Sequence, residues 1–262
     1  MGKGEMYGAN AGASNSGGTY AQPGASKFGD MDVGIEIRHA FIRKVYAIVF
    51  LQLCVTAAMS VFAMVGSTME KPSAILAFLM LPYVYYTSLI GTFVLVCAMI
   101  CGGERCRRHP TNIILLFLFT VMISVVIAVV CGLLNAVGKG DTVRNAALIT
   151  AGVVAGLTAF AFQTKYDFTG TGPYLFVALW CLFIAGFVSF FFPPSNAWNM
   201  VYSGVGALIF SFFLVYDTQL VVGGSHRKYQ LSIDEYVFAA LNIYLDIINL
   251  FLYILQMLNS RN

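Results

Sequence analysis

The chain has 262 residues, of which 59% are hydrophobic and only 10% are charged, and its mean hydropathy is +0.79. Soluble globular domains carry about 25% charged residues, so this composition indicates a membrane protein and leaves no room for a soluble domain. The net charge of +3 lies mainly along one predicted membrane face, which indicates a role in topology and not nucleic-acid binding.

The first 36 residues have a different composition from the rest of the chain. Gly, Ala, Ser and Asn dominate the opening MGKGEMYGANAGASNSGG, and such a segment has too few apolar side chains to form a core. We therefore predict a disordered cytosolic tail at residues 1–36 and a transmembrane domain at residues 37–262. The tail lacks the apolar region of a signal peptide, so the first span is expected to direct membrane insertion.

Seven apolar runs of about 20 residues follow the tail, and each can cross a hydrocarbon core about 30 Å thick. Because unpaired backbone groups are costly in lipid, we predict an all-α membrane protein in which all seven runs are helices. The second run is the longest and contains Pro82, where we expect a kink. The predicted spans are Val45–Val65, Ser73–Cys101, Thr111–Leu134, Ala146–Phe162, Pro173–Phe192, Trp198–Val222 and Tyr236–Leu258.

The distribution of basic residues predicts the orientation of these spans. With a cytosolic N-terminus, eleven of the fifteen Lys and Arg residues lie on the inner side, as the positive-inside rule requires. An odd number of spans then places the C-terminus outside, whereas a re-entrant seventh segment would return it to the cytosol.

Two acids, Asp217 and Asp246, are the ionisable residues inside the seven predicted spans. A carboxylate at the centre of a transmembrane helix costs about 2.5–3.5 kcal/mol on insertion scales, and such residues usually face a bundle interior or a water-filled cavity. The alternative is that each acid only caps a helix end or joins a polar packing contact. Asn242, Asp246, Asn249 and Tyr253 share one helical face, so we expect the seventh helix to be central, surrounded by the other six.

The sixth and seventh spans are antiparallel neighbours in the sequence, so their two acids can come to similar depths. Two carboxylates in a dry site cannot both ionise cheaply, and we expect them to share one proton and titrate as a unit. When both are ionised they repel each other and attract a cation. Calcium prefers hard oxygen ligands, so we predict weak calcium binding by Asp217 and Asp246, with Asn242 and Asn249 in support.

Other polar and small residues inside the spans have two interpretations each. Gln52 and Thr56 share a face of the first span, where they either form interhelical hydrogen bonds or line the ion path. Gly152 and Gly156 form a GxxxG pattern, which favours close packing inside the bundle over a dimer interface.

Paired aspartates on neighbouring helices also occur in intramembrane aspartyl proteases, and VYDT at residues 215–218 is similar to one of their elements. Their second element, GxGD, is missing, because Ile243, Tyr244 and Leu245 precede Asp246. We therefore expect that the chain is not an enzyme and needs no cofactor.

Several stretches resemble the transmembrane Bax inhibitor motif family, in its lifeguard branch, and together they cover residues 41–258. They are FIRKVYAIVFLQLCVT, RRHPTNIILLFLFT, FQTKYDFTG, FSFFLVYDTQLVVGG and EYVFAALNIYLDIINLFLYIL. The resemblance implies seven helices around a central last one, and a pH-sensitive di-aspartyl unit formed by Asp217 and Asp246. It also implies calcium leak from intracellular stores, suppression of cell death, and a Golgi, endoplasmic reticulum or plasma membrane location. Some relatives have a basic latch residue in the second helix, but Ser73–Cys101 contains none.

From the residues and the resemblance together, we predict a pH-regulated, calcium-permeable leak channel with an anti-apoptotic role. The expected partners are calcium ions and membrane lipid. The alternative is a survival regulator that does not conduct ions and acts by binding other membrane proteins of the cell-death machinery.

Overall fold

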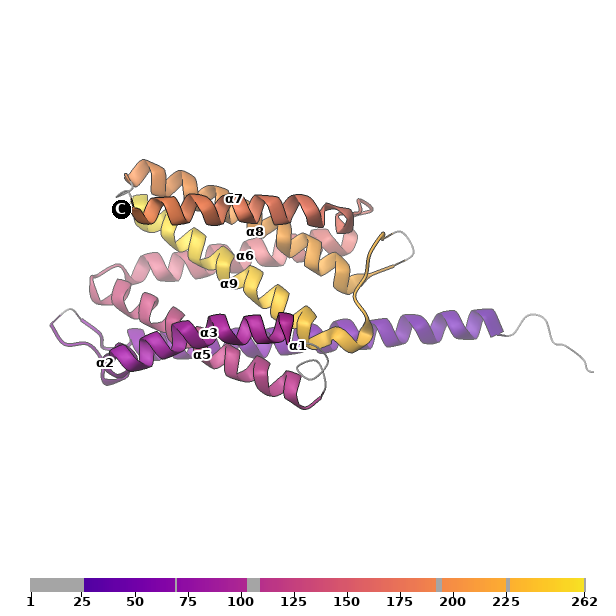
Figure 1. Ribbon diagram of the computed structural model, residues 1–262, viewed down its shortest axis with the longest axis horizontal. Coiled ribbons are helices and arrows are strands. Elements are labelled where there is room, and N and C mark those ends of the chain that lie inside the picture. Colours follow the sequence, from indigo (N-terminus) through magenta and orange to yellow (C-terminus); the bar gives the residue numbers. More distant parts are fainter. Residues whose placement is uncertain (1–25, 69, 103–108, 192–194, 225–226, 262) are drawn as a thin grey trace, which may run out of the picture. The chain divides into compact units, whose positions relative to one another are not determined.

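A computed structural model of the chain describes residues 26–68, 70–102, 109–191, 195–224 and 227–261. The chain divides into two compact units, Met1–Ile37 and Arg38–Asn262. The second unit contains the helical bundle shown in Figure 1. Within the described residues there are helices and no strands.

Seven helices in the described ranges are long and apolar enough to cross a membrane, so the prediction of an all-α protein with seven spans is confirmed. Short elements connect some of them: α2, Ala74–Leu79, and the 3-10 turns Thr169–Thr171 and Ile233–Glu235. The seven long helices are α1, Ser26–Met64; α3, Pro82–Cys101; α5, Thr111–Ala136; α6, Gly140–Gln163; α7, Gly172–Phe191; α8, Asn196–Val222; and α9, Tyr236–Arg261.

Helix α1 begins at Ser26, within the segment for which the sequence predicted disorder. The Gly- and Ser-rich composition ends near Gly29, and only one glycine, Gly34, interrupts residues 30–41. Helix formation over residues 26–36 is therefore compatible with the local composition, and the tail boundary at residue 36 stays a prediction. The rest of the predicted tail, residues 1–25, lies outside the described residues.

The predicted second span is two helices and not one kinked helix. The side chain of Ser73 accepts a hydrogen bond from the Leu76 N–H and caps α2, and α3 then starts afresh with Pro82 in its first turn. Proline lacks an N–H and fixes φ, so it suits the first turn of a helix better than its interior. Pro82 thus separates the two helices where a kink was expected.

Helix α9 is the most buried span, with 61% of its most apolar window inside the protein. It packs along most of α8 and also contacts α6 and α5. Figure 1 shows α9 crossing the bundle diagonally between α8 and α5. These contacts agree with a central last helix, although enclosure by all six others stays a prediction.

The GxxxG pattern of α6 does not pack closely against another helix. A Cβ atom added to Gly152 or Gly156 would meet no other heavy atom within 4 Å. The prediction of close packing inside the bundle is therefore wrong for this pair. By contrast, an added Cβ on Gly206 of α8 would lie 2.5 Å from the ring of Tyr253 on α9. The close approach of two helices thus occurs at a glycine that the GxxxG pattern did not indicate.

Candidate functional site

The two acids lie on facing helices at the α8–α9 interface. Asp217 is on α8 and Asp246 on α9, and their side chains are only 6% and 5% exposed. The two carboxyl groups are near enough to interact electrostatically. Because a carboxylate has no hydrogen to donate, a hydrogen bond between them requires a proton on one of the two acids. Oxygen Oδ2 of Asp246 is buried and has no partner among the hydrogen bonds of the described residues.

A second polar cluster connects α1, α5 and α9 beside the acids. Thr56 Oγ1 lies 2.8 Å from Ser124 Oγ and 2.7 Å from the hydroxyl of Tyr244. Gln52 Nε2 donates to Thr120 Oγ1 over 2.8 Å, and both glutamine and threonine are buried. These contacts favour the packing interpretation of Gln52 and Thr56. Thr56 also lines a cavity, described below.

The other members of the predicted polar stripe have separate surroundings. Asn242 and Asn249 are half-buried, and the Asn249 amide donates to the Leu245 carbonyl of its own helix over 2.8 Å. Tyr253 stacks on Phe210, with ring centroids 5.7 Å apart, and packs against α8. Tyr253 is therefore a packing residue of the α8–α9 interface in this structure.

Arg38 binds the C-terminal end of α8, little more than one turn beyond Asp217. Its guanidinium donates to three main-chain carbonyls at distances of 2.7–3.1 Å, those of Leu220, Val222 and Leu231. The last carbonyls of a helix lack partners within the helix, and a cation there also interacts favourably with the helix dipole. Arg38 thus joins the start of the bundle to the segment between α8 and α9.

The loop between α6 and α7 is bound to the same end of α8. Gln219 is fully buried; its amide nitrogen donates to the Tyr166 carbonyl over 3.0 Å, and its amide oxygen accepts from the Phe168 N–H over 2.7 Å. The buried guanidinium of Arg227 also binds the Tyr166 carbonyl, and it donates to the Thr164 carbonyl over 2.9 Å. Gln219 therefore fixes the loop between α6 and α7 to α8 two residues after Asp217, and Arg227 joins that loop to the segment between α8 and α9.

An exposed acid completes this contact between the loops. Asp167 accepts hydrogen bonds from the hydroxyl of Thr169 over 2.7 Å and from the main-chain N–H of Lys228 over 2.8 Å. Desolvation acts to raise the pKa of Asp167, but these hydrogen bonds outweigh it, so the pKa lies below its ordinary value. The ionised form of Asp167 therefore stabilises the contact between the two loops.

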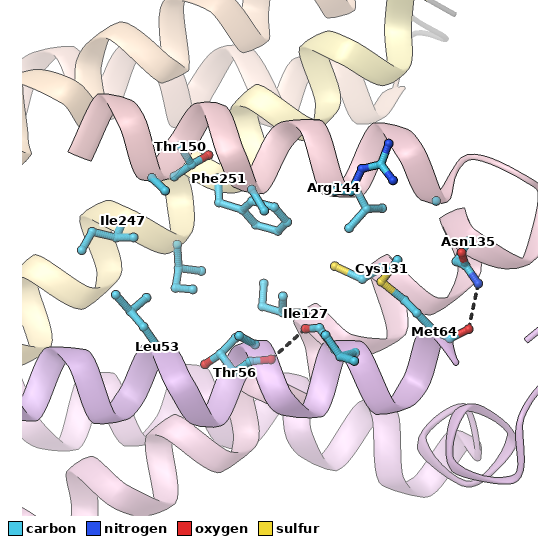
Figure 2. A pocket seen from close by; sticks show the side chains of 18 of the residues that line it. Leu53, Thr56, Met64, Ile127, Cys131, Asn135, Arg144, Thr150, Ile247 and Phe251 are labelled. Carbon is cyan, nitrogen blue, oxygen red and sulfur yellow. Dashed lines mark hydrogen bonds between the residues drawn. The ribbon is translucent and has the colours of Figure 1, made fainter. Parts of the chain in front are cut away.

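A cavity of about 1030 Å³ lies between α1, α5, α6 and α9 (Figure 2). Figure 2 shows Arg144 and Asn135 toward one end, and Leu53, Thr150 and Ile247 toward the other. Ile247 directly follows Asp246 in α9, yet neither acid of the pair belongs to the described lining. The end lined by Leu53, Thr150 and Ile247, here called the inner end, is therefore next to Asp246 along α9, but neither acid lines it.

Sequence reasoning missed four residues of this region: Arg38, Arg227, Gln219 and Tyr244. The two arginines were counted only as charges that set orientation, and their carbonyl partners leave no pattern in the sequence. The sequence does contain one pattern that indicates the polar contact between α1 and α5. Thr120 and Ser124 of α5 repeat the four-residue spacing of Gln52 and Thr56, which is the pattern expected for two polar helix faces that meet.

Among the described residues, no group of three or more His, Cys, Asp or Glu side chains could hold a metal ion. Calcium usually takes six to eight oxygen ligands, so two carboxyl groups alone do not complete a calcium site.

Comparisons with known proteins relate the chain to one family. The profile of the family described as inhibitor of apoptosis-promoting Bax1 matches residues 38–262. The chain is 38% identical over 233 residues to human protein lifeguard 3, covering 87% of the chain and 70% of that relative. It is also 36% identical over 233 residues to mouse protein lifeguard 4, covering 87% and 88% respectively. This chain therefore belongs to the family of inhibitors of apoptosis-promoting Bax1, and within it to the lifeguard branch.

Proposed function

We propose that this chain is a pH-regulated leak pathway for calcium ions in an intracellular membrane, and that it suppresses cell death. Membership of a family described as inhibiting apoptosis-promoting Bax1 supports the second part. The observation that carries the first part is the pair of buried, neighbouring acids on α8 and α9. We place the protein in the Golgi or endoplasmic reticulum membrane, with a cytosolic N-terminus, from the family resemblance and the basic residues.

The proton shared by Asp217 and Asp246 is the element that responds to pH. While the proton is present, the hydrogen bond between the carboxyl groups holds α8 against α9 and the pathway is closed. When the proton leaves, two negative charges face each other in a poorly solvated site and repel. The same charges attract a divalent cation, so calcium flux rises as pH rises.

The position of the cavity indicates which way Asp246 would move when the pathway opens. Asp246 and Ile247 are consecutive in α9, and consecutive helical side chains point about 100° apart. A rotation of α9 by about this angle would bring Asp246 to the position from which Ile247 now lines the cavity. At the other end, the loops bound by Gln219 and Arg227 have to separate before an ion can leave.

The test is calcium flux into vesicles containing the purified protein, measured across a pH series. Asp246→Asn and Asp217→Asn each retain a hydrogen-bonding side chain that cannot ionise, so we expect low flux with little dependence on pH. Asp234→Asn is the matched control, because Asp234 is an exposed acid outside the bundle interior. Flux that keeps its full pH dependence in Asp246→Asn would refute the di-aspartyl mechanism.

The same variants distinguish calcium conduction from the alternative function, which is survival regulation through binding other membrane proteins without conduction. If Asp246→Asn loses calcium flux and also loses protection from cell death, conduction is the operative activity. If the variant loses flux and still protects cells at equal expression, protection operates through binding.

A further inference from the structure

The cavity of Figure 2 has the lining of a hydrocarbon site. Apolar residues from four helices form most of it, among them Leu53, Ile127, Val154, Ile248 and Phe251. Its volume, about 1030 Å³, lies at the upper end of the range of about 300–1,000 Å³ that is common for ligand pockets. A cavity of this size and character accommodates a large apolar group.

The polar side chains inside the cavity already have partners within the protein. Thr150 Oγ1 donates to the Ala146 carbonyl over 2.7 Å, and Ser60 Oγ donates to the Thr56 carbonyl over 2.8 Å. The Thr56 hydroxyl belongs to the cluster with Tyr244 and Ser124. A cation that has lost its water needs several oxygen ligands, whereas most of this lining is apolar, and dry apolar cavities accept apolar ligands in preference to water. The interior therefore favours an acyl chain over an ion.

The wall between α1 and α6 is open to the surroundings. Small or short side chains line the cavity there and are nevertheless exposed: Ala57 and Val61 on α1, and Ala147, Ala151 and Ala155 on α6. Because these helices are membrane spans, the medium outside this opening is lipid. From Gly140 to Ala155 the cavity follows sixteen residues of α6, about 22 Å at a rise of 1.5 Å per residue. One leaflet of the hydrocarbon core is about 15 Å thick, so a single acyl chain fits along this length.

The end of the cavity at the start of α6 suits an anionic headgroup. Arg144 lies there with its side chain 68% exposed, and only its Nη2 pairs with Asp141, over 3.1 Å. A guanidinium presents about five N–H donors, which leaves donors for a phosphate group. The α6 N-terminus has no side-chain cap, so its first N–H groups and its dipole add to the attraction for an anion.

We propose that this cavity binds one acyl chain of an anionic membrane phospholipid, which enters between α1 and α6 and places its phosphate group at Arg144. This site does not depend on the proposed calcium flux. Bound lipid fills the space into which Asp246 would turn, so the same site is placed to oppose opening.

The first test measures phospholipid that stays bound after detergent extraction, by mass spectrometry of the intact protein. The protein is reconstituted in vesicles with equal amounts of phosphatidylserine and phosphatidylcholine and then extracted. We expect one phospholipid per chain, with phosphatidylserine preferred. Ala151→Trp fills the cavity and lowers retention about tenfold, which is about 1.4 kcal/mol. Leu148→Trp is the control, because Leu148 lies on α6 outside the lining and is 66% exposed.

Arg144→Gln separates headgroup recognition from filling of the cavity. This variant is expected to keep one phospholipid but to lose the preference for phosphatidylserine. Equal retention by Ala151→Trp and Leu148→Trp, or no retained phospholipid in the unmodified chain, would overturn the proposal. If Ala151→Trp does not fold, Ala147→Leu reduces the cavity by a smaller amount and replaces it.

A second measurement needs no variant. Phosphatidylserine with a photoreactive group at the end of one acyl chain is added to vesicles that contain the full chain. Cross-links are expected at the inner end of the cavity, in peptides containing Leu53 or Ile247. Cross-links confined to outward-facing residues of α3 and α7 would count against the site.

Discussion

Substituting Gly206 by alanine tests whether α8 and α9 are held together by the contact that the structure describes. The added Cβ would lie 2.5–2.8 Å from three ring carbons of Tyr253, which is shorter than real contacts allow. Overpacking of this kind costs about 1–3 kcal/mol. Replacing a helical glycine by alanine gains about 0.5–1 kcal/mol, so the net destabilisation of Gly206→Ala is about 0–2.5 kcal/mol.

Gly156→Ala is the matched control, since an added Cβ there meets no heavy atom within 4 Å. Gly156→Ala gains the same free energy from helix propensity but introduces no steric clash. The two variants should therefore differ in unfolding free energy by about 1–3 kcal/mol. Circular dichroism during unfolding of the detergent-solubilised protein measures this difference. Adding Tyr253→Leu should recover stability in the Gly206→Ala variant, while the same change alone destabilises the protein. Equal stability of Gly206→Ala and Gly156→Ala would refute the close α8–α9 approach.

Three further predictions concern the polar contacts. Arg38→Gln removes charged donors from three main-chain carbonyls and should lower the free energy of unfolding by about 1.5–3 kcal/mol. Arg38→Lys should retain only part of this stability, because an ammonium group cannot reach all three carbonyls. Thermal unfolding of the unmodified chain and the two variants measures both effects. Since hydrogen bonds hold the Asp167 pKa below its ordinary value of 3.8, its contribution to stability is present above that pH and is lost as pH falls through the folded-state value. The melting temperatures of the unmodified chain and Asp167→Asn should therefore differ at neutral pH and converge in strong acid. A double-mutant cycle of Thr56→Val and Tyr244→Phe should give a coupling free energy of about 0.5–1.7 kcal/mol, and a coupling near zero would exclude a net contribution from their 2.7 Å hydrogen bond.

The hydrophobic runs predicted the spans well because lipid imposes both their length and their helical structure. Six of the seven predicted spans overlap a single observed helix along most of their length, and the second was divided at Pro82. That division depends on the hydrogen bond that caps α2 at Ser73, a local contact that hydropathy does not encode. Hydropathy identifies where a helix can exist, whereas caps decide where it ends.

The candidate site was predictable only where a residue is costly in lipid. Asp217 and Asp246 could be identified from the sequence because burying an acid needs a reason. Tyr253 was placed on the polar face of the seventh span with Asp246, but a tyrosine ring also packs well, and its stacking on Phe210 is visible only in the structure. Arg38 and Arg227 bind main-chain carbonyls, which every residue possesses, so no pairing pattern in the sequence indicates them.

The distribution of polar contacts along α8 indicates where α8 and α9 can separate. At the C-terminal end of α8, Arg38 of α1 binds main-chain carbonyls of α8, and Gln219 binds main-chain groups of the loop between α6 and α7. Arg227, in the segment after α8, binds the same loop. At Gly206, about three turns before Asp217, the contact with α9 is the packed ring of Tyr253. Hydrogen bonds to charged groups resist separation more than an apolar contact that lipid can replace. We therefore expect α8 to pivot about its C-terminal end when the acids repel, with the larger displacement on the side of Gly206. Distance measurements between spin labels at the two ends of α8 and α9, made at low and high pH, would show no such asymmetry if the whole interface opened in parallel.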